Sequence, residues 1–174
     1  NLDSEVLIIG TGALAKIFMN GFVKLGFKKI NISSIMDESA QQFVQSSARF
    51  LFDVELSFIP QARLVSLPGV HGVMINTTPI NDNNELLEDL SYFNFLQKNG
   101  LVVDVNLLPI ESTLLKEAVS VGARVISGYE FVGATDALWA GAISGRHFSE
   151  GDYTVYMLQS LQNRDAKELA DNLS

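Results

Sequence analysis

The sequence contains no cysteine and only two histidines. The absence of cysteine excludes disulfide bonds and thiolate metal sites, and it leaves the cellular compartment open on this evidence. His71 and His147 lie far apart and lack companions at the spacing of metal ligands. We therefore expect both to be surface or loop residues, and we predict no metal site.

Long hydrophobic runs are also missing. The longest apolar stretches, such as Val6–Ile9 and Leu101–Val103, are far too short to cross a bilayer. Residues 1–5 are polar, and Val6–Ile9 leads directly into a glycine turn, so no signal peptide is expected either. These absences predict no membrane partner.

Positive charge is scarce. Twelve Lys and Arg face twenty Asp and Glu, for a formal net charge of −8, and Lys28 and Lys29 are the only adjacent basic pair. Nonspecific attraction to nucleic acid or to anionic lipid is therefore excluded as a function.

The chain does have the composition of an ordinary globular protein, with 174 residues, 47% hydrophobic and 18% charged. Strand-like and helix-like segments alternate along it. Strands are expected at 6–9, 29–33, 54–59, 72–76, 101–105 and 124–126, and helices at 13–25, 38–49, 60–67, 86–98, 112–121, 131–143 and 153–172. Strands separated by single helices require right-handed crossovers, which predicts an α/β, doubly wound, mostly parallel sheet with helices on both faces. We expect residues 1–174 to form one domain, with a C-terminal helix from about residue 152.

The most informative motif lies between the first strand and the first helix. It fits the G-x-G-x-x-G/A fingerprint of Rossmann-type dinucleotide sites and consists of Gly10, Thr11, Gly12, Ala13, Leu14 and Ala15. The first glycine permits the tight turn, the second lets a pyrophosphate approach the backbone, and the small third residue lets helix pack on strand. The amides of residues 12 to 14 would face the phosphates from the positive end of the helix. The alternative is a structural turn that binds no ligand.

Four blocks resemble the C-terminal half of the shikimate dehydrogenases. They are VLIIGTGALA at 6–15, INTTP at 75–79, VVDVNLLPIESTLLKEAVSVGARVISG at 102–128, and the segment 128–145. The third block is the most specific, since it matches the family pattern in order and without gaps. The four blocks together cover the chain to about residue 148.

The resemblance implies a Rossmann domain that binds NADP beside a separate substrate domain. In that family the substrate domain comes first and supplies the catalytic Lys and Asp, so it is expected to lie outside this chain. This chain is then catalytically incomplete, with no catalytic residue of its own, and cytoplasmic. Cofactor-binding positions implied beyond the glycine turn are Ser34, Asp37, Asn76, Thr77, Thr78, Val105 and Gly128, and substrate-side positions are Asp104, Leu107 and Thr135.

Departures from the family pattern bear on the cofactor. Where the family carries the Arg that faces the adenosine 2′-phosphate, this sequence has Ile35, which offers no charge. Asp37 follows two residues later and either approaches the ribose or caps the next helix. A carboxylate in either role repels a 2′-phosphate, so NAD is favoured over NADP.

Departures on the substrate side concern Leu107, which replaces a Tyr, and Thr135, which replaces a Gln. A site built on hydrogen bonds discriminates strongly, so these changes argue against shikimate as the substrate. Neutral drift in a working enzyme is the alternative. Tyr129 and Trp139 lie on the segment that faces the cleft in the family, and an aromatic wall there is one alternative. Core or helix-face packing is expected for the phenylalanines Phe43, Phe50, Phe52 and Phe58.

Two functions remain open. The first is an oxidoreductase that moves hydride between a nicotinamide dinucleotide and a cyclic hydroxy acid, with this domain positioning the cofactor. The second is a catalytically silent relative, a nucleotide-sensing or scaffold domain, because fold alone does not decide function.

Overall fold

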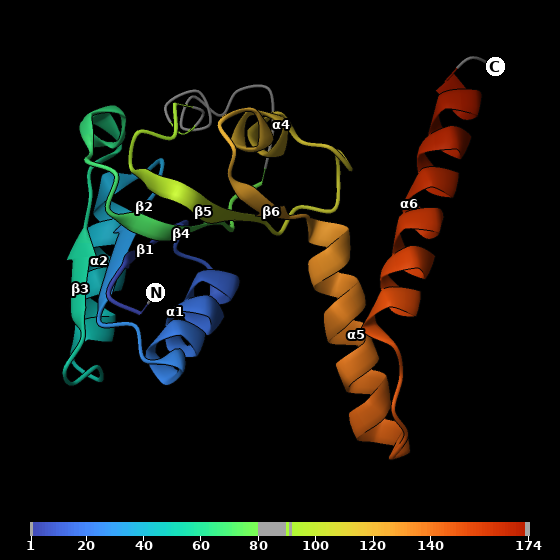
Figure 1. Ribbon diagram of the computed structural model, residues 1–174, viewed down its shortest axis with the longest axis horizontal. Helices are drawn as coiled ribbons and strands as arrows, with labels where there is room; N and C mark the ends of the chain where they lie inside the picture. Colours follow the sequence, from blue (N-terminus) through green and yellow to red (C-terminus); the bar gives the residue numbers. More distant parts are fainter. Residues whose placement is uncertain (1, 80–89, 91, 173–174) are drawn as a thin grey trace.

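The structure is a computed structural model that describes residues 2–79, 90 and 92–172, with side chains as far as residue 164. A six-stranded sheet runs through it in the order β3-β2-β1-β4-β5-β6, and every strand pair is parallel (Figure 1). The strands are β1 (Glu5–Ile9), β2 (Lys29–Ser33), β3 (Glu55–Phe58), β4 (His71–Asn76), β5 (Leu96–Asp104) and β6 (Arg124–Ile126). The predicted doubly wound α/β fold is confirmed.

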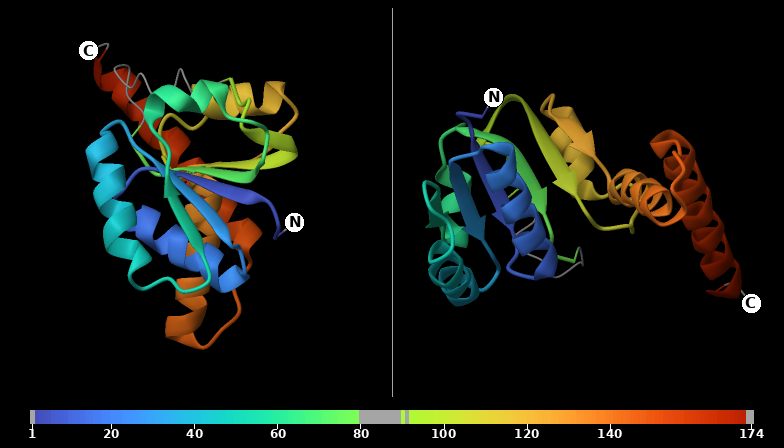
Figure 2. Two further views of the ribbon diagram at one scale, coloured as in Figure 1. Left: turned by 90° about the vertical axis from the view of Figure 1, so that its left-hand side faces the viewer. Right: turned by 90° about the horizontal axis from the view of Figure 1, so that it is seen from below.

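Helices cover both faces of this sheet (Figures 1 and 2). One face carries α1 (Ala13–Leu25) and α2 (Asp37–Ala48), and the other carries the 3₁₀ helix η1 (Gln61–Ser66) and α4 (Thr113–Ser120). Alternate residues of β1 enter the two cores: Val6 and Ile8 pack towards α1 and α2, while Leu7 and Ile9 pack towards η1 and α4. Burial on both faces explains why β1 reads as a continuous apolar run.

The helix expected at 86–98 is confirmed at Leu90, but it ends before residue 96. Residues 80–89 and 91 lie outside the described part of the chain, but Leu96 already belongs to β5. The Asn-Gly pair, interpreted as a helix end, lies inside that strand, where Asn99 has a φ of 60° and the register with β4 shifts. Asn tolerates this left-handed conformation, so Asn-Gly marks a bulge here as readily as it marks a helix end.

Three further expectations about single residues are corrected. Phe50 and Phe52 are 80% and 84% exposed instead of packed, although Phe43 is buried as expected. They lie in the connection between α2 and β3, where their side chains stay exposed to solvent. His71 is 1% exposed and opens a buried strand, so it is not a surface residue, whereas His147 is exposed. Within the described residues, no group of His, Asp or Glu is suited to a metal ion.

Beyond the β6 edge, α5 (Gly128–Ser144) and α6 (Glu150–Asn172) form an antiparallel pair that projects away from the sheet (Figures 1 and 2). The start of α5 packs against α1 through Phe131, whose ring centroid lies 5.2 Å from that of Phe18. No helix in the described part of the chain is long and apolar enough to cross a membrane.

The close packing of α5 on α6 depends on Gly133. A Cβ atom there would lie 2.6 Å from the Thr154 Cα and 2.7 Å from its backbone nitrogen, closer than real side chains approach. Gly133→Ala should therefore lower the thermal unfolding midpoint. The matched control is Gly21→Ala on α1, where nothing lies within 4 Å and the usual helix preference for Ala, about 1 kcal/mol, should raise the midpoint by roughly 2–4 °C. Circular dichroism melts measure both, and a midpoint that rises equally in the two variants would contradict the packing argument.

Candidate functional site

The glycine turn lies at the carboxyl end of β1, at the centre of the strand order. Gly10 has a φ of 112°, and its N–H donates to the Ser33 carbonyl at 2.8 Å. A Cβ atom at this position would collide with the Thr77 hydroxyl. Both the backbone conformation and the close approach of β4 therefore require glycine here.

Gly12 has a different role, because it caps α1 with an ordinary φ of −78° and a Cβ built there would meet nothing within 4 Å. No side chain caps the first turn of α1, and that turn holds no acidic residue. The first N–H groups of the helix are therefore open to an anion, at the positive end of the helix dipole. Ala15, one turn on, is fully buried against the sheet, as the fingerprint predicts for its last position.

Residues at the end of β4 form the floor beside this turn. The Thr77 N–H and Oγ1 both donate to the Ile9 carbonyl, at 2.9 and 2.7 Å. The Asn76 Oδ1 accepts from the Thr78 N–H at 3.1 Å and from its hydroxyl at 2.6 Å. These bonds fix the ends of β1 and β4 relative to each other, where the order of strands reverses direction.

Asp104, at the end of β5, is 1% exposed and fully engaged in hydrogen bonds. Its Oδ1 accepts from the Asn106 side chain at 2.7 Å, from the Asn106 N–H at 3.2 Å and from Asn76 at 3.3 Å. Its Oδ2 accepts from Ser112 at 2.8 Å, and Ser112 in turn caps α4. The carboxylate thus anchors the loop after β5.

The remaining positions that the family resemblance implied, for cofactor and for substrate, lie in the loop after β5 and on α5. The Val105 N–H donates to the Asn76 carbonyl at 3.2 Å. Gly128 starts α5 so close to the Asn106 carbonyl that a side chain would collide with it. Leu107 is half-buried, and the Thr135 hydroxyl donates to carbonyls of its own helix, Phe131 at 3.1 Å among them.

The aromatic wall, which the sequence left open as an alternative, does not form, because Tyr129 and Trp139 lie in different surroundings. Tyr129 lines a cavity of about 560 Å³ between α4 and the α5–α6 pair. Trp139 is 68% exposed and shares a shallow pocket with Thr135.

The end of β2, beside the glycine turn, is apolar at its surface. Ser34 is buried, whereas Ile35 is 53% and Met36 65% exposed. Met36 is the N-cap of α2, so the alternative of Asp37 as a helix cap is wrong. Asp37 is the first helical residue, and its Oδ1 accepts from the Gln61 N–H at 3.2 Å.

Two features of this region escaped the sequence reasoning. A groove of about 390 Å³ runs from the glycine turn between α1 and α2, and it is lined by Thr11, Lys16, Ser39, Gln42, Phe43 and Ser46. The helical spacing of its α2 residues was the available signal, as was a lysine one turn into α1. The second feature is the Ser33 hydroxyl beneath the turn, which is buried and has no hydrogen-bond partner.

Known proteins resemble this chain in sequence. No model of a protein family matches the sequence. A curated protein that does match is the shikimate dehydrogenase (NADP(+)) of Nitrosopumilus maritimus, which is 28% identical over 130 residues. That alignment covers 75% of this chain and 46% of the relative, and the matching proteins of Pelobacter propionicus and Gloeothece citriformis are also named shikimate dehydrogenase (NADP(+)). The chain is related to the shikimate dehydrogenases. It spans about half the length of the curated relatives it matches.

Solved structures of shikimate dehydrogenases share the fold. The Thermus thermophilus enzyme in complex with shikimate superposes with a TM-score of 0.71 over 93% of this chain and 56% of its own, at 16% identity. The Listeria monocytogenes enzyme in complex with shikimate and NAD gives the same TM-score over 91% of this chain and 57% of its own, at 18% identity. The strand order and the glycine turn thus agree with the sequence relatives, because all three resemble shikimate dehydrogenases.

Proposed function

We propose that this chain is the dinucleotide-binding part of a shikimate-dehydrogenase-like oxidoreductase. The observation that carries the proposal is Gly12, whose Cβ position faces open space before an uncapped helix start. It lies where the strand order reverses between β1 and β4, the place at which open α/β sheets bind their ligands.

The residues present fit a dinucleotide. The N–H groups at the start of α1 would hold the pyrophosphate, and Gly12 would let it approach. The floor made by Asn76, Thr77 and Thr78, together with Val105 and Gly128, would orient the nicotinamide end. The buried Ser33 hydroxyl, still unpartnered, is available to a ligand or an ordered water beneath the turn. The bound cofactor supplies the hydride chemistry, and the chain supplies position and exclusion of water.

NAD is the cofactor we propose, although the curated relatives are named for NADP(+). The exposed Ile35 offers an apolar surface and no charge where a 2′-phosphate would need a cation. Asp37 adds a carboxylate nearby. Among the residues of the adjoining groove, Lys16 is the one cation.

Calorimetric titration tests this preference. NADH should bind roughly tenfold or more tightly than NADPH, because a hydrogen bond to a charged group contributes about 1.5–3 kcal/mol and Ile35 makes none. Ile35→Arg should narrow or reverse the difference. The control is Lys16→Ala, which should leave NADH binding unchanged. Tighter NADPH binding that is lost in Lys16→Ala would contradict the proposal and assign the phosphate to Lys16.

A second candidate function is a silent relative that binds nucleotide without catalysis. It is favoured by Leu107 and by Thr135, whose hydroxyl already donates within its own helix. If the chain belongs to an active oxidoreductase, we propose that a substrate-binding region completes the site. The half of the relatives that this chain does not match would be such a region. Dinucleotide binding with no turnover in the presence of that region would support the silent relative.

A further inference from the structure

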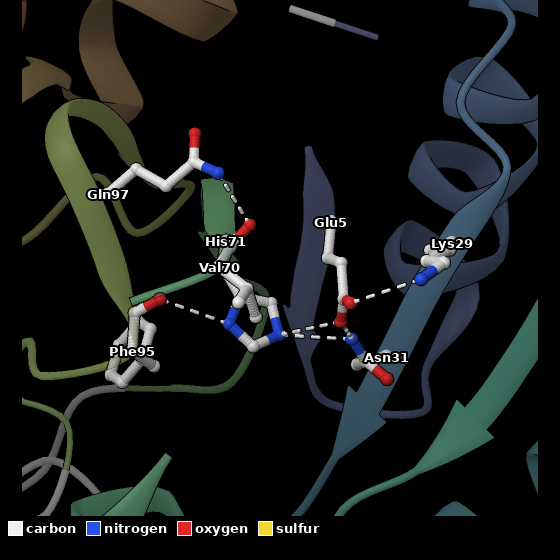
Figure 3. A network of polar contacts seen from close by, with 7 residues as sticks. All are labelled: Glu5, Lys29, Asn31, Val70, His71, Phe95 and Gln97. Atoms are coloured by element: carbon white, nitrogen blue, oxygen red, sulfur yellow. Dashed lines mark hydrogen bonds and ion pairs between the residues drawn. The ribbon is translucent and has the colours of Figure 1, made fainter. Parts of the chain in front are cut away.

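The strands of the sheet begin at the end opposite the glycine turn, called here the amino edge of the sheet. There the buried His71 ring joins β4 to the start of β5 (Figure 3). Its Nδ1 lies 3.1 Å from the Phe95 carbonyl oxygen, which also accepts from the His71 backbone N–H at 3.0 Å. A carbonyl oxygen can only accept. In the neutral ring, Nδ1 therefore carries the proton and Nε2 is a bare acceptor.

The acceptor at Nε2 is satisfied by Asn31, on β2. The Asn31 Nδ2 lies 3.0 Å from the His71 Nε2 and 2.7 Å from Oε2 of Glu5 on β1. Its two hydrogens thus serve two acceptors, one on each side. The other Glu5 oxygen lies 3.7 Å from the Lys29 Nζ (Figure 3). The cluster ties β1, β2 and β4 to the residue that precedes β5.

We propose that this cluster is an acid-sensitive clamp, in which proton uptake at the His71 Nε2 breaks its bond with Asn31 and loosens the amino edge of the sheet. A solvent proton on Nε2 turns that atom into a donor, facing the N–H donors of Asn31. Turning the amide over gives no relief, because its oxygen would then face the Glu5 carboxylate.

The charges around the ring do not offset this conflict. Glu5 Oε2 is 3.8 Å from Nε2, which favours the protonated ring, but Lys29 on β2 already faces the same carboxylate. From the β5 side, Phe95 and Gln97 contribute no charge, and Gln97 donates to a backbone carbonyl at 2.9 Å.

Stability should therefore depend on pH in a defined direction. Burial lowers the pKa of His71 below its ordinary 6.5, against smaller opposing effects of the Phe95 carbonyl and Glu5. Since the unfolded chain then binds the proton more readily, the contribution is complete above pH 6.5 and is lost as the pH falls from 6.5 towards the folded-state pKa. Within that window the folding equilibrium constant should fall by up to about tenfold per pH unit.

Urea unfolding of the 174-residue chain between about pH 5 and pH 8 tests the clamp. The wild type should lose stability as acid is added, and the matched control His147→Gln, at the other and exposed histidine, should show the same slope. His71→Gln should flatten the slope. Asn31→Asp should invert it, because a carboxylate beside Nε2 and Glu5 favours the protonated ring, so that stability rises with acid.

The slope is the readout, so a general loss of stability in a variant does not obscure the result. If His71→Gln fails to fold, two measurements remain. Asn31→Asp is one, and long-range ¹H–¹⁵N spectra of the wild-type imidazoles are the other. Those spectra should show the Nδ1–H tautomer for His71 at neutral pH. An Nε2–H tautomer, or equal acid slopes in the wild type and the His71 variant, would overturn the proposal.

Discussion

Gly12→Val is expected to abolish dinucleotide binding while the protein stays folded. The Gly12 φ of −78° suits any residue, and a Cβ there meets nothing within 4 Å, so valine fits the free protein. The same side chain occupies the space that a pyrophosphate needs. Losing two charge-assisted hydrogen bonds, at about 1.5–3 kcal/mol each, weakens binding by roughly 100-fold or more. Calorimetry with NADH measures the loss, and circular dichroism checks the fold.

The matched control is valine at the first glycine of the same turn. Gly10→Val forces a φ of 112° on a β-branched residue and drives its side chain into Thr77. This variant should be clearly destabilised, by about 1–3 kcal/mol or more. The two glycines thus separate folding from binding. Retained affinity in a folded Gly12→Val protein would show that the turn has a structural role alone.

No turnover of shikimate is expected from the 174-residue chain by itself, with NADH or NADPH. A general acid–base pair contributes about 10²–10⁴ to such a rate, and orientation of the substrate contributes more. Two ion pairs of lysines in the described residues, Lys29–Glu5 and Lys116–Glu111, involve β2 and α4 and not the glycine turn. Leu107 cannot donate to a ring hydroxyl.

The assay follows nicotinamide absorbance with shikimate, quinate and related hydroxy acids, against a blank with cofactor alone. A rate above the blank from this chain would contradict the view that it is catalytically incomplete. A longer protein that includes a substrate domain should prefer a less hydroxylated substrate. Adding Leu107→Tyr and Thr135→Gln to that protein should then raise shikimate turnover, whereas robust wild-type turnover would show that both positions are tolerated drift.

The sequence predicted the parts of the fold in which local pattern and tertiary packing agree. The apolar run of β1, its glycine turn and the amphipathic α1 that ends at Gly26 are all found, because each residue there has one role. The helix expected at 86–98 failed at Leu96, where burial of the neighbouring Phe95 in the core extends β5 across an Asn-Gly pair. Helix propensity is a weak guide when tertiary packing competes with it.

The candidate site also has parts that local sequence pattern predicts and parts that depend on distant partners. The glycine turn was predictable, since its residues act through backbone geometry that sequence spacing fixes. The roles of Asp104 and Asp37 were not, because each depends on partners distant in sequence: Asn76 for Asp104 and Gln61 for Asp37. His71 was misjudged for the same reason, since a single polar residue shows its burial only when Asn31 is placed beside it.

Backbone amide spectra during an NADH titration test the central claim most directly. The account predicts that the largest ¹H–¹⁵N shift changes fall on Gly12, Ala13 and Leu14, with smaller ones at Thr77 and Thr78 and none at the His71 cluster on the opposite edge. Saturable changes centred elsewhere, such as the cavity between α4 and the α5–α6 pair, would contradict it, as would a spectrum that NADH leaves unchanged.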